Sequence, residues 1–154
     1  MFIEKIVRFI DSVSSKSIWV NKGRKVEIRK KCYFDRPKQV FLGDGSFVNR
    51  NCQFHIGCND MATIKLDKNV YVGMNVLFVC VSHKIGNQDK RAGQNLYRSI
   101  KVGEGTWIGA NSTILPNVEI GRGCIIAAGA VVVNSVEDNC IVGGVPARLI
   151  KRLK

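Results

Sequence analysis

The sequence predicts an all-β solenoid in which the chain turns a corner every six residues. Helices repeat at about 3.6 residues and strands at about 2. Neither period explains the spacing of six that separates Val102, Ile108, Ile114, Ile120, Ile126 and Val132. A triangular coil with three short faces does explain it, because each face returns one apolar side chain to the axis. About eighteen residues then make one coil, and the chain is long enough for roughly five coils.

The residues between these apolar positions have the chemistry of tight corners. Small side chains stand two residues before successive apolar anchors, at Thr106, Ser112, Cys124 and Ala130. Glycine and asparagine tolerate positive φ and tight turns. They recur at other corner positions, among them Gly45, Asn51, Gly73, Asn75, Gly105, Gly109, Asn111 and Gly123. We therefore expect neighbouring coils to pair as strands about 4.8 Å apart.

Following the repeat backward shows where it is irregular. Val40 and Leu42 mark a shift of phase, and Asp60 stands where an apolar anchor is expected. We place the β-helix at residues 26–81 and 100–136, with an interruption at 82–99. The interrupting segment is polar. In a solenoid such an insertion forms a loop leaving one face, often the binding face.

Both ends of the chain depart from the repeat. Apolar residues recur at helical spacing up to about Ser12, so residues 1–20 predict a short amphipathic helix and cap. We expect it to cover the open edge of the first coil rather than to bind a membrane, because it is short and carries mixed charge. In the tail at 143–154, Gly143, Gly144 and Pro146 break the repeat. A short basic helix is expected from about Ala147.

The composition suits one domain with a continuous core. The chain has 154 residues, of which 45% are apolar. Its formal net charge of +12 favours polyanions, anionic membranes or a phosphorylated ligand, or else a solvated basic surface. The six cysteines form no C-x-x-C pair, so we expect reduced packing residues in a cytoplasmic protein. We expect no signal peptide and no membrane span, although peripheral membrane contact stays open.

Two histidines are the candidates for acid–base chemistry. Imidazole is the usual general base near neutral pH, and a base must lie where substrates can reach it. His83 stands where the repeat gives way to the insertion, whereas His55 lies inside the repeat. We therefore favour His83. Cys80 and Ser82 are close in sequence, but spacing alone does not place either as a nucleophile beside it.

Two other site types fit poorly. A histidine-only catalytic zinc site needs three histidines, and the chain has two. The G-x-G elements, such as Gly43 with Gly45, are corner glycines without a following helix, so they do not predict a dinucleotide site.

Four motifs together resemble the hexapeptide-repeat acyltransferases, in particular their maltose, galactoside and capsular-polysaccharide O-acetyltransferase group. They are WIG at 107–109, ILP at 114–116, AAGAVV at 127–132 and GGVPAR at 143–148. The resemblance covers residues 66–153 well and the N-terminal third more loosely. It implies a left-handed parallel β-helix, a homotrimer with active sites between subunits, and acetyl transfer from acetyl-CoA.

The same resemblance implies roles for particular residues. The family's catalytic histidine falls on His83, and its polar residue near the acceptor falls on Asn75, which also reads as a corner asparagine. Asp89 is a further candidate for the acceptor site. The cofactor-binding positions fall on Trp107, Gly109, Ala110, Ala127, Ala128, Arg148 and Lys151. Many members have Thr-Lys where this chain has Val133 and Asn134, which removes one cationic contact to CoA.

The expected function is acetyl-CoA-dependent O-acetylation of a sugar or polysaccharide hydroxyl, as in polysaccharide biosynthesis. The mechanism is direct transfer with His83 as general base and no metal. Asp89, Glu104 or a backbone carbonyl could orient the imidazole, and the sequence does not choose among them. Three alternatives stay open: N-acetylation of an amino sugar or other small amine, a γ-carbonic-anhydrase-like solenoid, and a non-catalytic solenoid that binds an anionic polymer. Nucleic acid is not expected as a partner.

Overall fold

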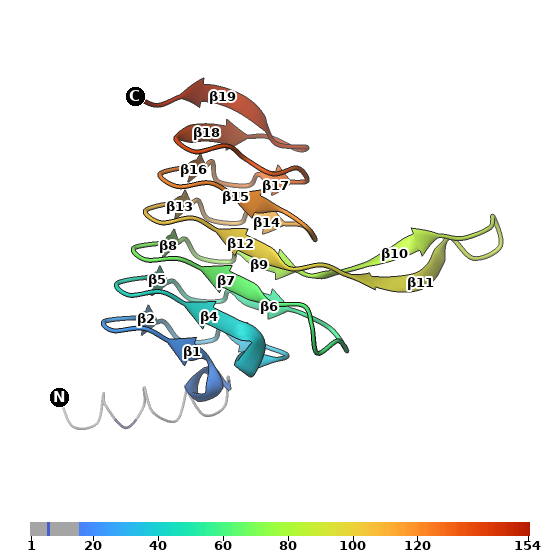
Figure 1. Cartoon of the computed structure of the whole chain (residues 1–154), viewed down its shortest axis with the longest axis horizontal. Coiled ribbons are helices and arrows are strands. Elements are labelled where there is room, and N and C mark those ends of the chain that lie inside the picture. The colour runs from blue at the N-terminus through green and yellow to red at the C-terminus, as the bar shows by residue number, and fades with distance from the viewer. Residues whose placement is uncertain (1–5, 7–15) are drawn as a thin grey trace.

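The computed structural model describes Ile6 and residues 16–154, and the chain from Asn21 onward winds into a three-sided prism (Figure 1). Within the described residues, sheet A contains β1 (Asn21–Lys22), β4 (Val40–Leu42), β7 (Ile64–Leu66), β12 (Ile100–Val102) and β15 (Glu119–Ile120). Sheet C contains β3 (Tyr33–Phe34), β6 (Gln53–His55), β9 (Leu77–Val79), β14 (Thr113–Ile114) and β17 (Val131–Val132).

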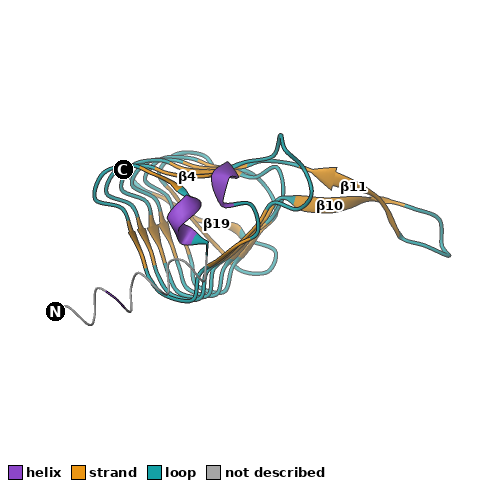
Figure 2. Ribbon diagram, turned by 90° about the horizontal axis from the view of Figure 1, so that it is seen from below, coloured by secondary structure: helices purple, strands orange, loops and turns teal. Residues whose placement is uncertain are grey.

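Sheet B forms the remaining side and continues furthest toward the C-terminus. It contains β2 (Glu27–Ile28), β5 (Phe47–Val48), β8 (Tyr71–Val72), β13 (Trp107–Ile108), β16 (Ile125–Ile126), β18 (Cys140–Gly143) and β19 (Arg148–Arg152). The chain visits A, B and C in turn, so each coil contributes one strand to each sheet. Figure 2 looks along the stack and shows the coils superposed. The predicted all-β solenoid of about five coils is confirmed.

The core is a column of apolar side chains along the axis of the prism. Each predicted anchor from Val102 to Val132 is at most 3% exposed. Lower in the stack, Phe34, Phe54 and Phe78 are fully buried. Their rings stack with centroids 4.6 and 4.7 Å apart. The six-residue period therefore marks the inward positions, as predicted.

The two irregular places also match the sequence. In β4, Val40 and Leu42 are both buried on either side of exposed Phe41, directly after the short 3-10 helix η2 (Pro37–Gln39). The short helix thus shifts the phase of the six-residue repeat by two residues. Asp60 lies exposed in the irregular segment between β6 and β7, and its Oδ1 is 3.2 Å from Arg36 Nη1.

Corner residues with positive φ stack in columns. Between sheets A and B the column holds Lys25, Gly45, Asn69, Gly105, Gly123 and Asn139. Between sheets B and C it holds Lys31, Asn51, Asn75, Asn111 and Gly129. In the second column Asn51 Nδ2 donates to Asn75 Oδ1 at 3.1 Å, and Asn75 Nδ2 donates to Asn111 Oδ1 at 3.0 Å. Glycine and asparagine fill most of these corners, as expected, but the first coil uses lysine in both.

The interruption is a projecting β-hairpin rather than a plain loop. Strands β10 (Val81–Ile85) and β11 (Ala92–Tyr97) pair antiparallel and extend away from the prism (Figure 1). The hairpin leaves after β9 of sheet C and returns before β12 of sheet A, so it springs from the corner opposite sheet B. At its base, a Cβ on Gly57 would lie 2.8 Å from Tyr97 Cε1, so only glycine leaves room for that ring.

The predicted C-terminal helix from Ala147 is wrong, because the chain there forms strand β19. It turns back through Gly144, with φ of 95°, and pairs antiparallel with β18. The reason is the open edge of β18, whose N–H and C=O groups need partners at the end of the stack. Residues 148–152 supply those partners, which a helix would not do.

Other expectations concern the N-terminus and the cysteines. Apart from Ile6, the amphipathic helix expected up to Ser12 lies outside the described residues, and the continuous described part begins at Lys16, directly before the 3-10 helix η1 (Ser17–Trp19). All six cysteines are free thiols, and five are buried packing residues as predicted, whereas Cys58 is exposed. In the portion of the chain that the structure describes, no helix is both long and apolar enough to cross a bilayer.

Candidate functional site

His83 lies on the hairpin, in strand β10, with its side chain exposed. Its Nδ1 is 3.1 Å from the backbone oxygen of Gly93 on β11. A carbonyl oxygen can only accept, so Nδ1 must carry the proton. In the neutral imidazole, Nε2 then keeps its lone pair and can take a proton from another molecule.

The other groups proposed to orient His83 lie elsewhere. Asp89 is exposed in the turn at the tip of the hairpin, beyond the end of β10 at Ile85. Glu104 is exposed at the corner between sheets A and B. Of the three alternatives, the structure thus pairs the imidazole with a backbone carbonyl. Every residue has a backbone carbonyl, so the sequence alone could not show which carbonyl contacts His83.

The neighbours of His83 on the chain are poorly placed as nucleophiles. Cys80 is fully buried. Burial, with a further contribution from the charge of Asp35, raises the pKa of its thiol to about 12. The reactive form of cysteine is the thiolate, so Cys80 is inert near neutral pH. Ser82 is the adjacent residue on the strand and points to the opposite face from His83.

The side chain of His55 makes its contacts within the solenoid. Its Nε2 lies 2.9 Å from Gln53 Oε1, and its ring centroid is 5.2 Å from that of Tyr33. It is half-buried on the outer face of sheet C. This environment supports the preference for His83.

The predicted cofactor residues come together on sheet B. Trp107 is 52% exposed on the outer face of β13. Gly109 and Ala110 follow β13, and Ala127 and Ala128 follow β16, at the same corner one coil apart. A Cβ on Gly109 would lie 2.6 Å from Ala128 N, so the two coils approach too closely there for any side chain.

The basic end of this surface is β19. Lys151 pairs with Ile141, which pairs with Ile125, which in turn pairs with Trp107. Lys151 therefore stands in line with Trp107 along sheet B, and both Lys151 and Arg148 are exposed. Residues 107–110, 127–128 and 148–151, separate in sequence, form one continuous surface.

The structure also places Trp107 in an outward-facing row whose other members sequence reasoning missed. Each of its members precedes a buried anchor of sheet B, in register from coil to coil: Phe47, Tyr71, Trp107, Ile125 and Ile141. The rings of Phe47 and Tyr71 stack at 4.9 Å. In the sequence, this row could have been found from the apolar residue that stands directly before every third anchor. The row makes sheet B the most apolar outer face near the predicted cofactor residues.

Asn75 is exposed at the corner between sheets B and C, and Asp89 is exposed at the hairpin tip, so their role near the acceptor stays a prediction. Both sides of the Asn75 amide are engaged in the corner ladder with Asn51 and Asn111. This is a structural role, so any contact with an acceptor would come in addition to it. Within one chain, the His83 hairpin lies at the corner between sheets C and A. The Trp107 surface lies on sheet B, which is the face opposite that corner (Figure 1).

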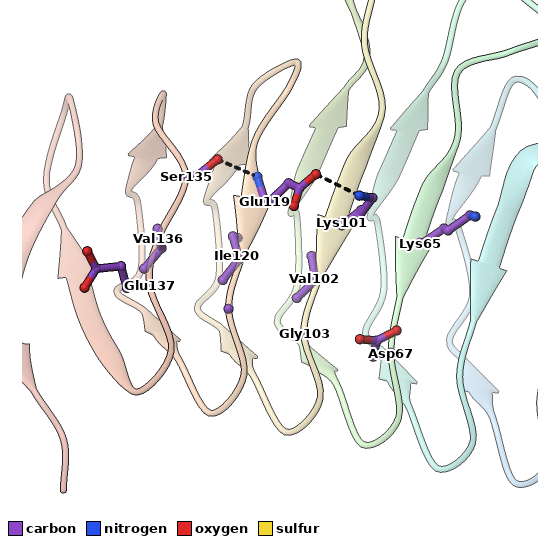
Figure 3. A pocket seen from close by; sticks show the side chains of 11 residues that line it. Lys65, Asp67, Lys101, Val102, Gly103, Glu119, Ile120, Ser135, Val136 and Glu137 are labelled. Atoms are coloured by element: carbon purple, nitrogen blue, oxygen red, sulfur yellow. Dashed lines mark hydrogen bonds and ion pairs between the residues drawn. The ribbon is translucent and has the colours of Figure 1, made fainter.

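A hollow on sheet A lies away from all these residues. Figure 3 shows its lining, with a volume of about 450 Å³, including Lys65, Lys101, Glu119 and Ser135. Lys101 Nζ is 2.8 Å from Glu119 Oε1, and Glu119 N donates to Ser135 Oγ at 3.0 Å. In residues 16–154 and Ile6, no three His, Cys, Asp or Glu side chains cluster as metal ligands do.

Comparisons with known proteins agree with the observed repeat and fold. The family model "Bacterial transferase hexapeptide (six repeats)" matches residues 99–134. A maltose O-acetyltransferase from Clostridium difficile 630 is 28% identical, with a TM-score of 0.78 over 87% of this chain and 70% of that one. A hexapeptide-repeat acetyltransferase from Vibrio cholerae, solved with acetyl coenzyme A, is 28% identical with a TM-score of 0.74 over 90% and 74%.

Sequence comparison gives the same grouping. The galactoside O-acetyltransferase of Escherichia coli is 25% identical over 138 residues, which are 90% of this chain and 66% of that protein. This chain spans about 60% of the length of other curated relatives that it matches. The repeat and the fold define a hexapeptide-repeat protein with a left-handed parallel β-helix. In sequence and fold the chain is similar to hexapeptide-repeat acyltransferases, among them the galactoside and maltose O-acetyltransferases.

Proposed function

We propose that the protein transfers an acetyl group from acetyl-CoA to a hydroxyl of a sugar or polysaccharide, with His83 as general base. The observation that carries this is the hydrogen bond from His83 Nδ1 to Gly93, which leaves Nε2 free on an exposed strand. The transfer of an acetyl group is inferred from the similarity to hexapeptide-repeat acetyltransferases. We place the reaction in the cytoplasm, because the cysteines are free thiols.

The proposed mechanism is direct transfer. Nε2 of His83 accepts the proton of the acceptor hydroxyl while the oxygen attacks the thioester carbonyl carbon. The C–O bond forms, the C–S bond breaks, and the imidazolium returns the proton to the leaving sulfur. Gly93 supports the imidazolium throughout, because its oxygen accepts from Nδ1–H in both protonation states. A backbone N–H of a neighbouring coil stabilises the oxyanion.

The surface around Trp107 suits the long arm of CoA. Ala110, Ala127 and Ala128 carry only a methyl group, so a ligand can lie against the coil, while buried Gly109 lets the two coils approach each other. Lys151, in line with Trp107, and Arg148, on the same strand, offer cations for phosphate at one end.

A complete site requires a second copy of the chain. His83 projects from the corner opposite sheet B, so its hairpin cannot serve the Trp107 surface of its own prism without folding back around it. In a closed trimer, the hairpin of one subunit reaches the sheet B surface of the next. Cyclic symmetry then makes three equal sites. The exposed apolar row on sheet B gives this contact its driving force.

The test is a turnover screen. Free CoA thiol is measured while acetyl-CoA is offered with a panel of mono-, di- and oligosaccharides, each paired with its amino-sugar analogue. We expect thiol release that depends on a hydroxyl acceptor and exceeds the acceptor-free rate. Faster release with the amino sugars would indicate N-acetylation instead. Release that no acceptor stimulates would contradict acetyl transfer to saccharides.

Replacing Lys151 by alanine is expected to weaken CoA binding about three- to tenfold at low salt, since one charge-assisted contact to phosphate is lost. High salt should shrink the difference through screening. Isothermal titration of CoA measures this, with pantetheine, which lacks the nucleotide phosphates, binding both proteins equally. The matched variant is Lys101→Ala, which removes one exposed lysine from sheet A. Equal weakening by both would contradict a phosphate contact at Lys151.

A further inference from the structure

The positive charge of the protein is concentrated in its first coil. Residues 16–39 hold nine of the 24 Lys and Arg residues but two of the 12 Asp and Glu residues. This segment therefore accounts for +7 of the net charge of +12. Arg24, Arg29 and Arg36 are ion-paired with Asp44, Glu27 and Asp60. No ion pair among the described residues involves the exposed lysines of the segment, Lys16, Lys22, Lys25, Lys30, Lys31 and Lys38.

These lysines form a ring around one end of the prism. Lys25 lies at the corner between sheets A and B, and Lys31 at the corner between B and C. Lys38, in η2, lies between β3 of sheet C and β4 of sheet A, and so occupies the third corner. Strands β1 to β3 form the terminal coil of the stack (Figure 1). Each corner of the terminal coil therefore carries an exposed lysine.

Two of the lysines occupy conformations that favour other residues. Lys25 has φ of 54° and Lys31 has φ of 62°. In the described coils above them, the same two columns hold glycine or asparagine at every position. The left-handed region is strained for a long side chain and easy for glycine and asparagine. Departures from such a local rule are expected at functional positions.

Apolar side chains are exposed at the same end. In η1, Ile18 is 42% exposed and Trp19 is 61% exposed. Only Ser17 separates them from Lys16. Trp19 also borders a hollow of about 490 Å³ whose charged lining residues are Arg36, Lys38, Asp35 and Asp60. An exposed tryptophan among lysines is typical of a membrane interface, where the ring enters the headgroup layer and the cations contact anionic lipid.

We propose that the first coil is a docking surface for an anionic lipid bilayer. The ring of lysines supplies the electrostatic attraction, and Ile18 and Trp19 supply the apolar contact. Stable peripheral binding needs two such signals together. A bilayer fits better than a linear polyanion, because exposed lysines stand at all three corners of the terminal coil and the apolar side chains of η1 lie beside η2 at one of these corners. The solenoid then stands upright, with the His83 hairpin several coils from the membrane.

The test uses the full chain and sedimentation with vesicles. We expect binding to vesicles of phosphatidylglycerol mixed with phosphatidylcholine, and little binding to phosphatidylcholine alone. High salt should reverse it. In a Trp107→Phe background, Trp19 is the sole tryptophan, and its emission should shift to the blue on the anionic vesicles. Absence of binding or of the shift would overturn the proposal.

The double variant Lys25→Asn, Lys31→Asn separates docking from folding. Asparagine suits both positions, so the melting temperature should stay equal or rise. Affinity for anionic vesicles should nevertheless fall roughly 25-fold, since each of the two lysines near such a surface contributes about fivefold. A lower melting temperature or unchanged vesicle affinity would overturn the proposed role.

The matched control is Lys68→Asn, Lys90→Asn, which removes two exposed lysines from turns outside the first coil. It should bind vesicles as the unchanged protein does. Dextran sulfate serves as a soluble polyanion. Binding of dextran sulfate without binding of vesicles would overturn the membrane assignment in favour of a linear polymer. Acetyl-CoA turnover is measured in parallel, so failure of this proposal is distinguishable from failure of the proposed enzyme activity.

Discussion

Replacing His83 by alanine is expected to lower kcat for acetyl transfer about 10²–10⁴-fold, the usual contribution of a general base. The affinity for CoA should stay unchanged, because the predicted cofactor residues lie on sheet B and not on the hairpin. Steady-state turnover with the best acceptor from the saccharide screen measures the first quantity, and isothermal titration of CoA the second. Undiminished kcat would rule out His83 as the base.

The matched control for His83 is the other histidine. His55→Ala removes an imidazole that contacts Gln53 and Tyr33 on sheet C. It should leave kcat within about twofold of the unchanged protein, since it takes no part in the proposed transfer. A loss comparable to that of His83→Ala would contradict the assignment, and would point to a site on sheet C. Size-exclusion chromatography of both variants checks that the assembly is retained.

The solenoid was predictable because its signal is periodic. Each anchor such as Ile108 or Ile126 has to be apolar to fill the axis, so a spacing of six survives in the sequence. The phase slip at Val40 and the irregular corner at Asp60 were visible for the same reason. The C-terminal strand was not predictable, since residues 148–152 have no helix or strand pattern of their own. The open edge of β18 decides their conformation.

The candidate site was predictable only in its side chains. His83 and Trp107 carry residue types that chemistry can use, and the interruption of the repeat drew attention to the first. The carbonyl of Gly93 leaves no trace in the residue type, although it fixes the tautomer of His83. The placement of His83 opposite sheet B follows from how sheets A, B and C succeed one another, which no single motif encodes.

Replacing Phe54 by alanine is expected to destabilise the fold by about 3–5 kcal/mol in the free energy of unfolding. Phe54 is fully buried and stacks on Phe34 in the coil below and Phe78 in the coil above, at 4.6 and 4.7 Å. The cavity would open in the middle of this column, where neighbouring backbones are held by the parallel ladders β3–β6 and β6–β9 and cannot collapse. Urea unfolding followed by circular dichroism measures the loss.

Phe47→Ala is the matched control, because Phe47 also belongs to a stacked pair, with Tyr71 at 4.9 Å, but lies on the outer face of sheet B. Its loss should cost about 1 kcal/mol, the contribution of one aromatic pair at a half-buried site. Both variants are compared at one protein concentration, since association of copies would add to apparent stability. Equal destabilisation by the two would contradict the special role of the phenylalanine column, because the outer row would then contribute as much to stability as the residues on the axis.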